Sequence, residues 1–116
     1  MNVHETLDAA ADYIERHGWF SHLYGSPSND FASLCMGNAI GACASHDVHV
    51  EAYAAVIRAL GCTDPVKHQV IWRWNDAPGR TKEEVVAMLR AVAMSERARE
   101  IRAEVALAHE QIRVIA

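Results

Sequence analysis

The fold is decided by residues 82–114, which read KEEVVAMLRAVAMSERAREIRAEVALAHEQIRV and contain neither glycine nor proline. Alanine, glutamate and arginine dominate this stretch, and all three favour an α-helix. Thr81 and Glu84 form a T-x-x-E capping box at its start. The sequence therefore predicts one long C-terminal helix. A straight helix of this length spans roughly 50 Å, whereas a compact chain of this size has a radius of gyration of about 13 Å.

Two apolar stripes mark this segment, and the second follows the first after a two-residue slip, at heptad-like spacing. Such a helix either overhangs the body, breaks near residues 94–97, folds back across its own domain, or buries its end against another chain. Because an exposed apolar stripe is unfavourable at ~25 cal/mol per Å², we expect a second copy to cover it, most simply as a dimer. The expected interface residues are Met94, Ala98, Ile101, Val105, Ala108 and Ile112.

Two further helices are expected before this segment. Residues 65–74 are assigned to a short helix because Asp64 is a good N-cap and Pro65 suits the first helical position. The same residues include VIWRW, which also suits a strand. Residues 47–60 show helical apolar spacing, and Asp47 is the candidate N-cap.

The N-terminal third completes the expected bundle. Residues 3–17 predict an amphipathic helix, residues 19–30 carry turn residues, and the nearly uncharged residues 31–44 predict a buried helix. The expected fold class is therefore all-α, a compact bundle of about five helices with a long C-terminal helix. Residues 1–93 are expected to form a small helical domain. Residues 94–116 would be a helical extension continuous with the last helix.

Composition and charge exclude several classes of protein. The chain has 116 residues, of which 51% are hydrophobic and 22% charged, as in a globular domain rather than a disordered one. Its formal net charge is −4, and neither half of the chain carries a basic patch. We therefore do not expect the protein to bind nucleic acid. We expect neither a signal peptide nor a membrane span. Three cysteines without a C-x-x-C pair indicate reduced thiols and a cytoplasmic protein.

A distinctive block, WNDAPGRTKEEVVAML, occupies residues 74–89 and combines turn residues with a helix start. Side chains of Asn75 or Asp76 can bond backbone N–H groups two residues further on. Arg80 lies where it can pair with Asp76 across the turn. We expect this block to form a structural corner built from Trp74, Asn75, Asp76, Pro78, Gly79, Arg80, Thr81 and Glu84.

This block resembles a domain-of-unknown-function family of small proteins from actinobacteria and their bacteriophages, which share W-N-D-x-x-G-R-T-x-x-E-V-x-x-L. The similarity extends to H-G-W at residues 17–19 and to CMGNAI at residues 35–40, where a cysteine opens a helix of small residues. It covers roughly residues 3–93 and leaves the tail outside. The resemblance implies a phage or actinobacterial context and a cytoplasmic setting. It supplies no catalytic residues.

Cys35 is the first candidate for chemistry, because a thiol near a helix N-terminus gains thiolate character. A helix that begins at Phe31 would instead place Cys35 a full turn inside, where a buried and inert thiol is the commoner state. A thiol-dependent hydrolase or transferase would also need a base and an orienting group. The candidate bases are His22, His46 and His68, and the candidate orienting groups are Asn75 and Asp76.

Two other sites are weaker candidates. Cys43, His46 and His49 follow a C-x-x-H-x-x-H spacing that could hold a metal if the chain bends, although zinc ligands are usually spaced differently. Cys62 or His68 would be the fourth ligand. The aromatic and basic residues Trp72, Arg73 and Trp74 could stack on nucleic-acid bases, but the acidic net charge favours core and interface use.

No motif in the chain supplies a nucleotide loop, a paired-carboxylate cleft or a firm metal site. The sequence therefore favours a small cytoplasmic interaction protein that self-associates through its C-terminal helix and needs no cofactor. A host protein is a further possible partner. The alternatives are a thiol enzyme that uses Cys35 and a metal-binding regulator that uses Cys43, His46 and His49.

Overall fold

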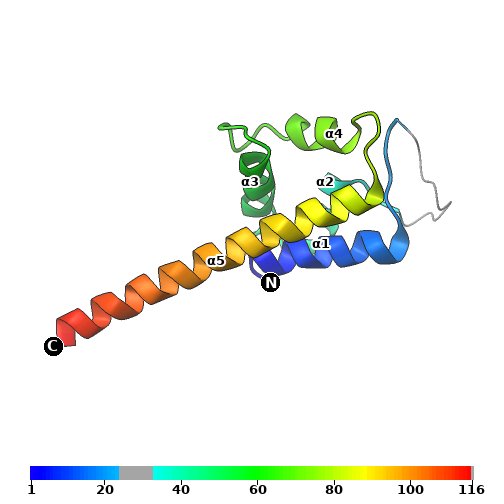
Figure 1. Cartoon of the computed structure of the whole chain (residues 1–116). Coiled ribbons are helices and arrows are strands. Elements are labelled where there is room, and N and C mark those ends of the chain that lie inside the picture. Colours follow the sequence, from blue (N-terminus) through cyan, green and yellow to red (C-terminus); the bar gives the residue numbers. More distant parts are fainter. Residues whose placement is uncertain (24–32, 116) are drawn as a thin grey trace.

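The structure, a computed structural model, describes residues 1–23 and 33–115, and in these ranges the chain is all-α (Figure 1). The fold class and the long last helix are confirmed. The turn expected at residues 25–30 and the helix start expected at Phe31 lie outside the described residues. In the described part of the chain five helices follow one another, namely α1 (Val3–His17), α2 (Met36–Cys43), α3 (His49–Ala59), α4 (Gln69–Asn75) and α5 (Lys82–Ile115).

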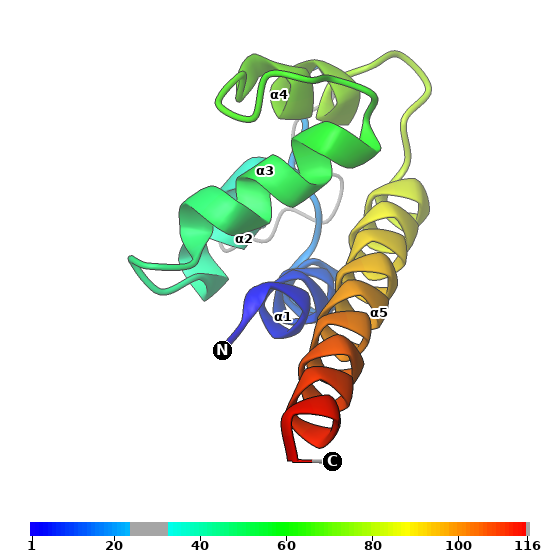
Figure 2. The same ribbon diagram turned by 90° about the vertical axis from the view of Figure 1, so that its left-hand side faces the viewer.

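The centre of the fold is an antiparallel pair formed by α1 and the first half of α5, which lie side by side in Figure 2. The capping box of Asn2 and Glu5 opens α1, as the sequence predicts. Helices α2 and α3 pack against this pair, and α4 packs against α2 and α3. The core takes apolar side chains from all five helices, and the largest fully buried ones are Leu7, Ile14, Met36, Ile40, Ile57, Ile71 and Leu89.

Helix α5 continues without a break far beyond this core (Figure 1). Its buried side chains all lie between Val85 and Ala93, and every residue from Ile101 to Ile115 is exposed. The molecule is consequently 61 Å long, and its radius of gyration is 16.2 Å rather than the roughly 13 Å of a compact chain. The overhanging arrangement is therefore the one adopted. Among the described residues, no helix combines the length and the apolar character that crossing a membrane requires.

Three helices start further along the chain than predicted, because local turns or pairing with a distant segment compete with the helix. The side chain of Asp64 accepts a hydrogen bond from Val66 N at 3.2 Å and forms a turn, so α4 begins at Gln69 rather than residue 65. The turn before α3 is closed by the Ser45 carbonyl instead of an Asp47 cap. Helix α2 begins at Met36, and the described residues 33–35 before it are not helical, because Leu34 pairs with the segment after α1. The choice of a helix rather than a strand is confirmed for residues 69–74.

Asn75 joins three segments of the fold by hydrogen bonds, although its side chain is only 1% exposed. Its Oδ1 accepts from Trp19 Nε1 at 2.7 Å and from Met36 N at 3.0 Å. Its Nδ2 donates to the Phe20 carbonyl at 3.1 Å. The end of α4, the start of α2 and the segment after α1 are thus fixed to one buried amide. Buried polar groups need such partners, because leaving one unpaired costs about 1–3 kcal/mol.

We predict that Asn75→Ala lowers the free energy of unfolding by about 3 kcal/mol, because the donors of Trp19 and Met36 lose their acceptor in the core. Urea denaturation followed by circular dichroism measures the effect. Asn38→Ala is the matched control, since Asn38 is exposed on α2 and its loss should change stability by less than about 0.5 kcal/mol. Equal losses in the two variants would contradict the central position of Asn75.

Candidate functional site

Cys35 is the N-cap of α2 and does not lie inside the helix as expected. The chain before it is held extended, because Phe20 N donates to the Leu34 carbonyl at 3.0 Å and Leu34 pairs with the segment after α1. Cys35 itself has an extended backbone, and its Sγ accepts from Asn38 N at 3.4 Å. The thiol therefore sits at the open end of α2. The residue is nevertheless only 3% exposed, so the thiol is at the helix N-terminus and also buried, and its reactivity depends on the groups around it.

The thiol lines a surface pocket of about 290 Å³ together with four side chains from other parts of the fold. One of them is His22, whose Nδ1 lies 3.1 Å from Asp76 Oδ2. The His22 backbone N–H also donates to Asp76 Oδ1 at 3.0 Å, so the carboxylate fixes both the ring and its backbone. The pocket is lined by His22, Cys35, Asn38, Trp72 and Asp76.

Of the bases and orienting groups that the sequence offered, the structure brings His22 and Asp76 to this pocket. His46 and His68 do not line it, and Asn75 is committed to the core. Sequence reasoning missed Asn38 and the pocket-facing placement of Trp72. The position of Asn38 three residues after an N-capping side chain is a signal that could have identified it.

The pocket holds a protonated thiol beside an ionised carboxylate. Burial raises the pKa of Cys35, and this effect outweighs the hydrogen bonds from the backbone N–H groups of Asn38 and Gly37, which lower it. Burial alone would also raise the pKa of Asp76, but hydrogen bonds from Asn75 and His22 and the charge of His22 bring it below its ordinary value. A base is therefore needed before Cys35 can react at neutral pH.

We predict that Asp76 makes the fold sensitive to acid. Because its folded-state pKa is lowered, Asp76 contributes stability that is present above the unfolded pKa of about 4 and is lost as the pH falls through the folded value. Asp76→Asn should therefore flatten the decline of unfolding free energy below about pH 4, as measured by urea titration at a series of pH values. Asp47→Asn, at an exposed carboxylate, is the control. A profile for Asp76→Asn that matches the unmodified chain would disprove this contribution.

The corner at residues 74–84 differs from expectation in its hydrogen bonds. Arg80 does not pair with Asp76, because its guanidinium lies 3.7 Å from the centre of the Trp74 ring and its Nε donates to the Trp74 carbonyl at 2.8 Å. Asn75 and Asp76 bond distant segments rather than the local turn. The capping box of Thr81 and Glu84 forms as predicted.

The metal candidates form a row of aromatic contacts. The rings of His46 and His49 are 5.7 Å apart, and the His49 ring is 6.0 Å from Tyr53, which in turn lies 5.1 Å from His68. His49 Nδ1 lies 2.8 Å from the His46 carbonyl, and Cys43 closes α2. Among residues 1–23 and 33–115, no three or more metal-ligating side chains gather closely enough to hold an ion. The metal hypothesis gains no geometric support.

The aromatic stacking candidates are divided between two environments. Trp72 is 55% exposed and forms one wall of the thiol pocket, whereas Trp74 is half-buried beneath Arg80. They therefore do not form one continuous platform for nucleic-acid bases.

The six expected interface residues lie on one face of α5, which we call the seam. At 100° per residue, the seam lies roughly opposite the buried side chains of Val85, Leu89 and Val92. Met94 is 74% exposed and Ile112 is 63% exposed, and both lie on it. The body-facing side also continues into the overhang through Leu107 and Val114, which sequence reasoning missed. Extending the first apolar stripe through Glu96 and Glu100 would have found them.

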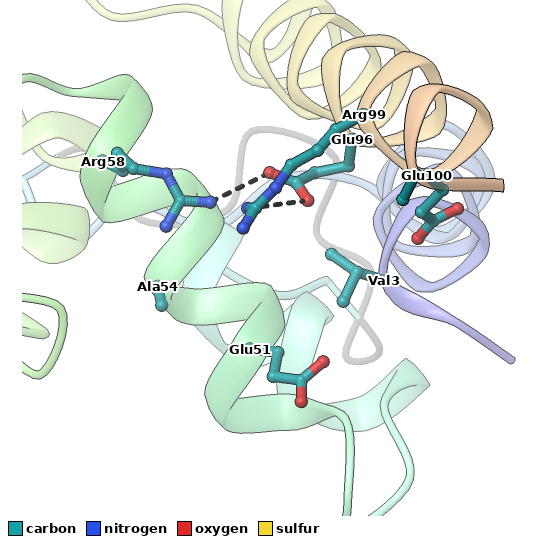
Figure 3. A pocket seen from close by; sticks show the side chains of 8 residues that line it. Val3, Glu51, Ala54, Arg58, Glu96, Arg99 and Glu100 are labelled. Carbon is teal, nitrogen blue, oxygen red and sulfur yellow. Dashed lines mark hydrogen bonds and ion pairs between the residues drawn. The ribbon is translucent and has the colours of Figure 1, made fainter. Parts of the chain in front are cut away.

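A second cavity, of about 430 Å³, lies between α3 and α5 at the point where α5 leaves the body (Figure 3). Arg58 donates to Glu96 at 3.0 Å, and Arg99 lies 3.8 Å from the same carboxylate. Glu51 and Glu100 add further carboxylates to the lining. The Arg58–Glu96 pair therefore joins α3 to α5 across this cavity, and no cysteine or histidine is among the described residues that line it.

These features define a small all-α protein with an overhanging last helix and a thiol pocket on its body. The model of a family of unknown function, DUF6197, matches residues 1–95, so the chain belongs to this family. The assignment agrees with the resemblance to a domain of unknown function. No curated protein and no solved structure matches the chain. The family match ends at residue 95, and the overhanging part of α5 lies beyond it.

Proposed function

We propose that the protein is a small cytoplasmic interaction module that forms a homodimer through the seam of α5. Residues 1–93 would be the body and residues 94–116 the dimerising extension. The observation that carries this proposal is the exposure of the seam, which presents Met94, Ile101, Val105 and Ile112 to solvent. Burying a side chain of this size contributes about 1.5–3 kcal/mol.

The seam faces away from the body of its own chain, so a second helix can pack against it. Because the seam lies opposite the buried face of α5 and every residue from Ile101 to Ile115 is exposed, a second helix can lie along the overhang beyond the body. The β-branched residues Ile101, Val105 and Ile112 and the small Ala108 recur at heptad spacing, as in helices that pack knobs into holes. A second α5 has the matching pattern and the matching length.

The charge of the extension favours a second copy over a strongly charged partner. Residues 94–116 contain four arginines and four glutamates, so their formal charges sum to zero, whereas the whole chain carries −4. Two such extensions do not repel each other, and neither attracts an acidic or basic surface strongly. The charged residues concerned are Arg97, Arg99, Arg102, Arg113, Glu96, Glu100, Glu104 and Glu110.

A host protein that presents an apolar helix is the second candidate partner, in keeping with the resemblance to actinobacterial and phage proteins. The seam would then form a heteromeric rather than a symmetric interface. Three free thiols among the described residues suit the reducing cytoplasm in which either partner would be met.

We predict that Val105→Glu converts the dimer to a monomer, because it introduces a charge into the centre of the seam. Leu107→Glu is the matched control, since Leu107 is exposed on the same helix but lies on the other face. Light scattering coupled to size exclusion, over a range of protein concentrations, gives the mass of each variant. The unmodified chain and Leu107→Glu should both show twice the monomer mass.

The proposal fails if the unmodified chain is a monomer at every concentration, or if the two glutamate variants dissociate to the same extent. Deleting residues 101–116 should also yield a monomer with an unchanged helical body, because every residue from Ile101 to Ile115 is exposed. Circular dichroism melting of this variant verifies that the body remains folded.

A further inference from the structure

We propose that the pocket at the start of α2 is an acyl-transfer site in which Cys35 is the nucleophile, His22 the general base and Asp76 the positioning residue. This activity is independent of dimerisation, because the pocket lies on the body and none of its residues belongs to α5. The ligand class that the site suits is a small ester or thioester.

The first support is that three complementary groups reach one pocket from three separate segments. Cys35 precedes α2, His22 follows α1, and Asp76 follows α4. Asp76 holds Nδ1 of His22 at 3.1 Å, which leaves Nε2 as the ring nitrogen that can accept a proton. A nucleophile, a base and a carboxylate that orients the base are the parts that covalent acyl transfer requires.

The second support is the supply of backbone N–H groups beside the sulfur. Asn38 N donates to Cys35 Sγ at 3.4 Å, and the N–H of Gly37 also faces the sulfur. Donors at this end of α2 can stabilise the negative oxygen that forms when a carbonyl is attacked. A small ester or thioester would therefore have its carbonyl carbon next to Cys35 Sγ and its carbonyl oxygen next to these N–H groups.

The pocket itself limits the size and character of the ligand. Its volume of about 290 Å³ lies at the lower end of small-molecule sites. The half-exposed Trp72 ring offers an apolar wall, and the Asn38 side chain lies at the lining of the same pocket. A short or flat acyl group matches this space better than a peptide or a long lipid chain.

The reaction consists of two balanced steps. His22 Nε2 takes the proton of the Cys35 thiol as the sulfur attacks the carbonyl carbon, so a C–S bond forms. The bond to the leaving alcohol or thiol then breaks, and the leaving group takes the proton from His22. Water or a second acceptor later displaces the acyl group from Cys35 and restores the thiol. Neither acylation nor deacylation of Cys35 changes an oxidation state, so no oxidant or reductant is needed.

The test uses the full chain and 4-nitrophenyl acetate as the probe. We expect a burst of one nitrophenolate per chain, and intact and peptide mass spectrometry should locate the acetyl group on Cys35. Cys35→Ser should abolish the burst while keeping an oxygen at the N-cap position of α2. Cys43→Ser is the control, because Cys43 is a half-buried thiol at the other end of the same helix.

His22→Ala should slow acylation by roughly 100-fold, as expected for loss of a general base. Because His22 is largely exposed, added imidazole should restore much of the rate, a recovery that a purely structural defect would not show. His46→Ala, at a histidine outside the pocket, is the control and should retain the full rate.

Asp76→Asn tests the positioning of His22. The variant removes the carboxylate that lies 3.1 Å from His22 Nδ1 and accepts from the His22 backbone N–H at 3.0 Å. The maximal acylation rate should therefore fall, while the probe concentration that gives half of this rate stays unchanged. Circular dichroism melting of each variant distinguishes this loss from unfolding.

Acetylation confined to Cys43, Cys62 or lysine side chains would overturn the proposal, as would an unchanged rate in His22→Ala. The monomeric Val105→Glu variant should acylate at the full rate. The acylation test can therefore fail in a chain that forms a dimer, and it can succeed in a chain that is monomeric.

Discussion

The packing of α5 against α1 is the interaction on which the rest of the structure depends. Over this contact Leu89 is buried in the core, and Arg90 lies 2.8 Å from Asp12 and 3.2 Å from Glu15. The 15 residues of α1 cover roughly 22 Å, whereas the 34 residues of α5 extend roughly 51 Å. The same contact that anchors α5 therefore also directs its second half away from the body.

The body and the thiol pocket are connected through the end of α4. Asn75 fixes the start of α2 from inside the core, and the adjacent Asp76 faces outward and fixes His22. The buried amide thus determines where Cys35 sits, and the carboxylate determines which side of the His22 ring faces the pocket. Two neighbouring residues at the end of α4 give the pocket its geometry, and no residue of α5 lines it.

Much of the fold could be predicted from local chemistry. The spacing of apolar residues identifies α1 and α5, and the capping box of Thr81 and Glu84 marks the start of α5 correctly. The starts of α2, α3 and α4 could not be predicted, because competing turns and long-range bonds decide them. The segment before Cys35 is held extended by pairing with residues near Trp19, which no local pattern reveals.

The candidate site was predictable only as a set of alternatives. The sequence offered three histidines and two orienting groups for Cys35, and contacts between distant segments select His22 and Asp76. The pairing expected between Arg80 and Asp76 does not form, because Arg80 lies over the Trp74 ring and pairs with Glu84. By contrast, the seam follows from helical spacing alone, since it lies on one straight helix.

The central claim is that a second copy covers the overhang of α5. Hydrogen–deuterium exchange of residues 104–115, measured by mass spectrometry over a range of protein concentrations, tests it most directly. A helix end of this length without packing partners frays readily in water, so its amides exchange fast. The account predicts protection of these amides that increases with concentration, alongside constant protection in α1. Fast exchange of the overhang at every concentration would contradict it.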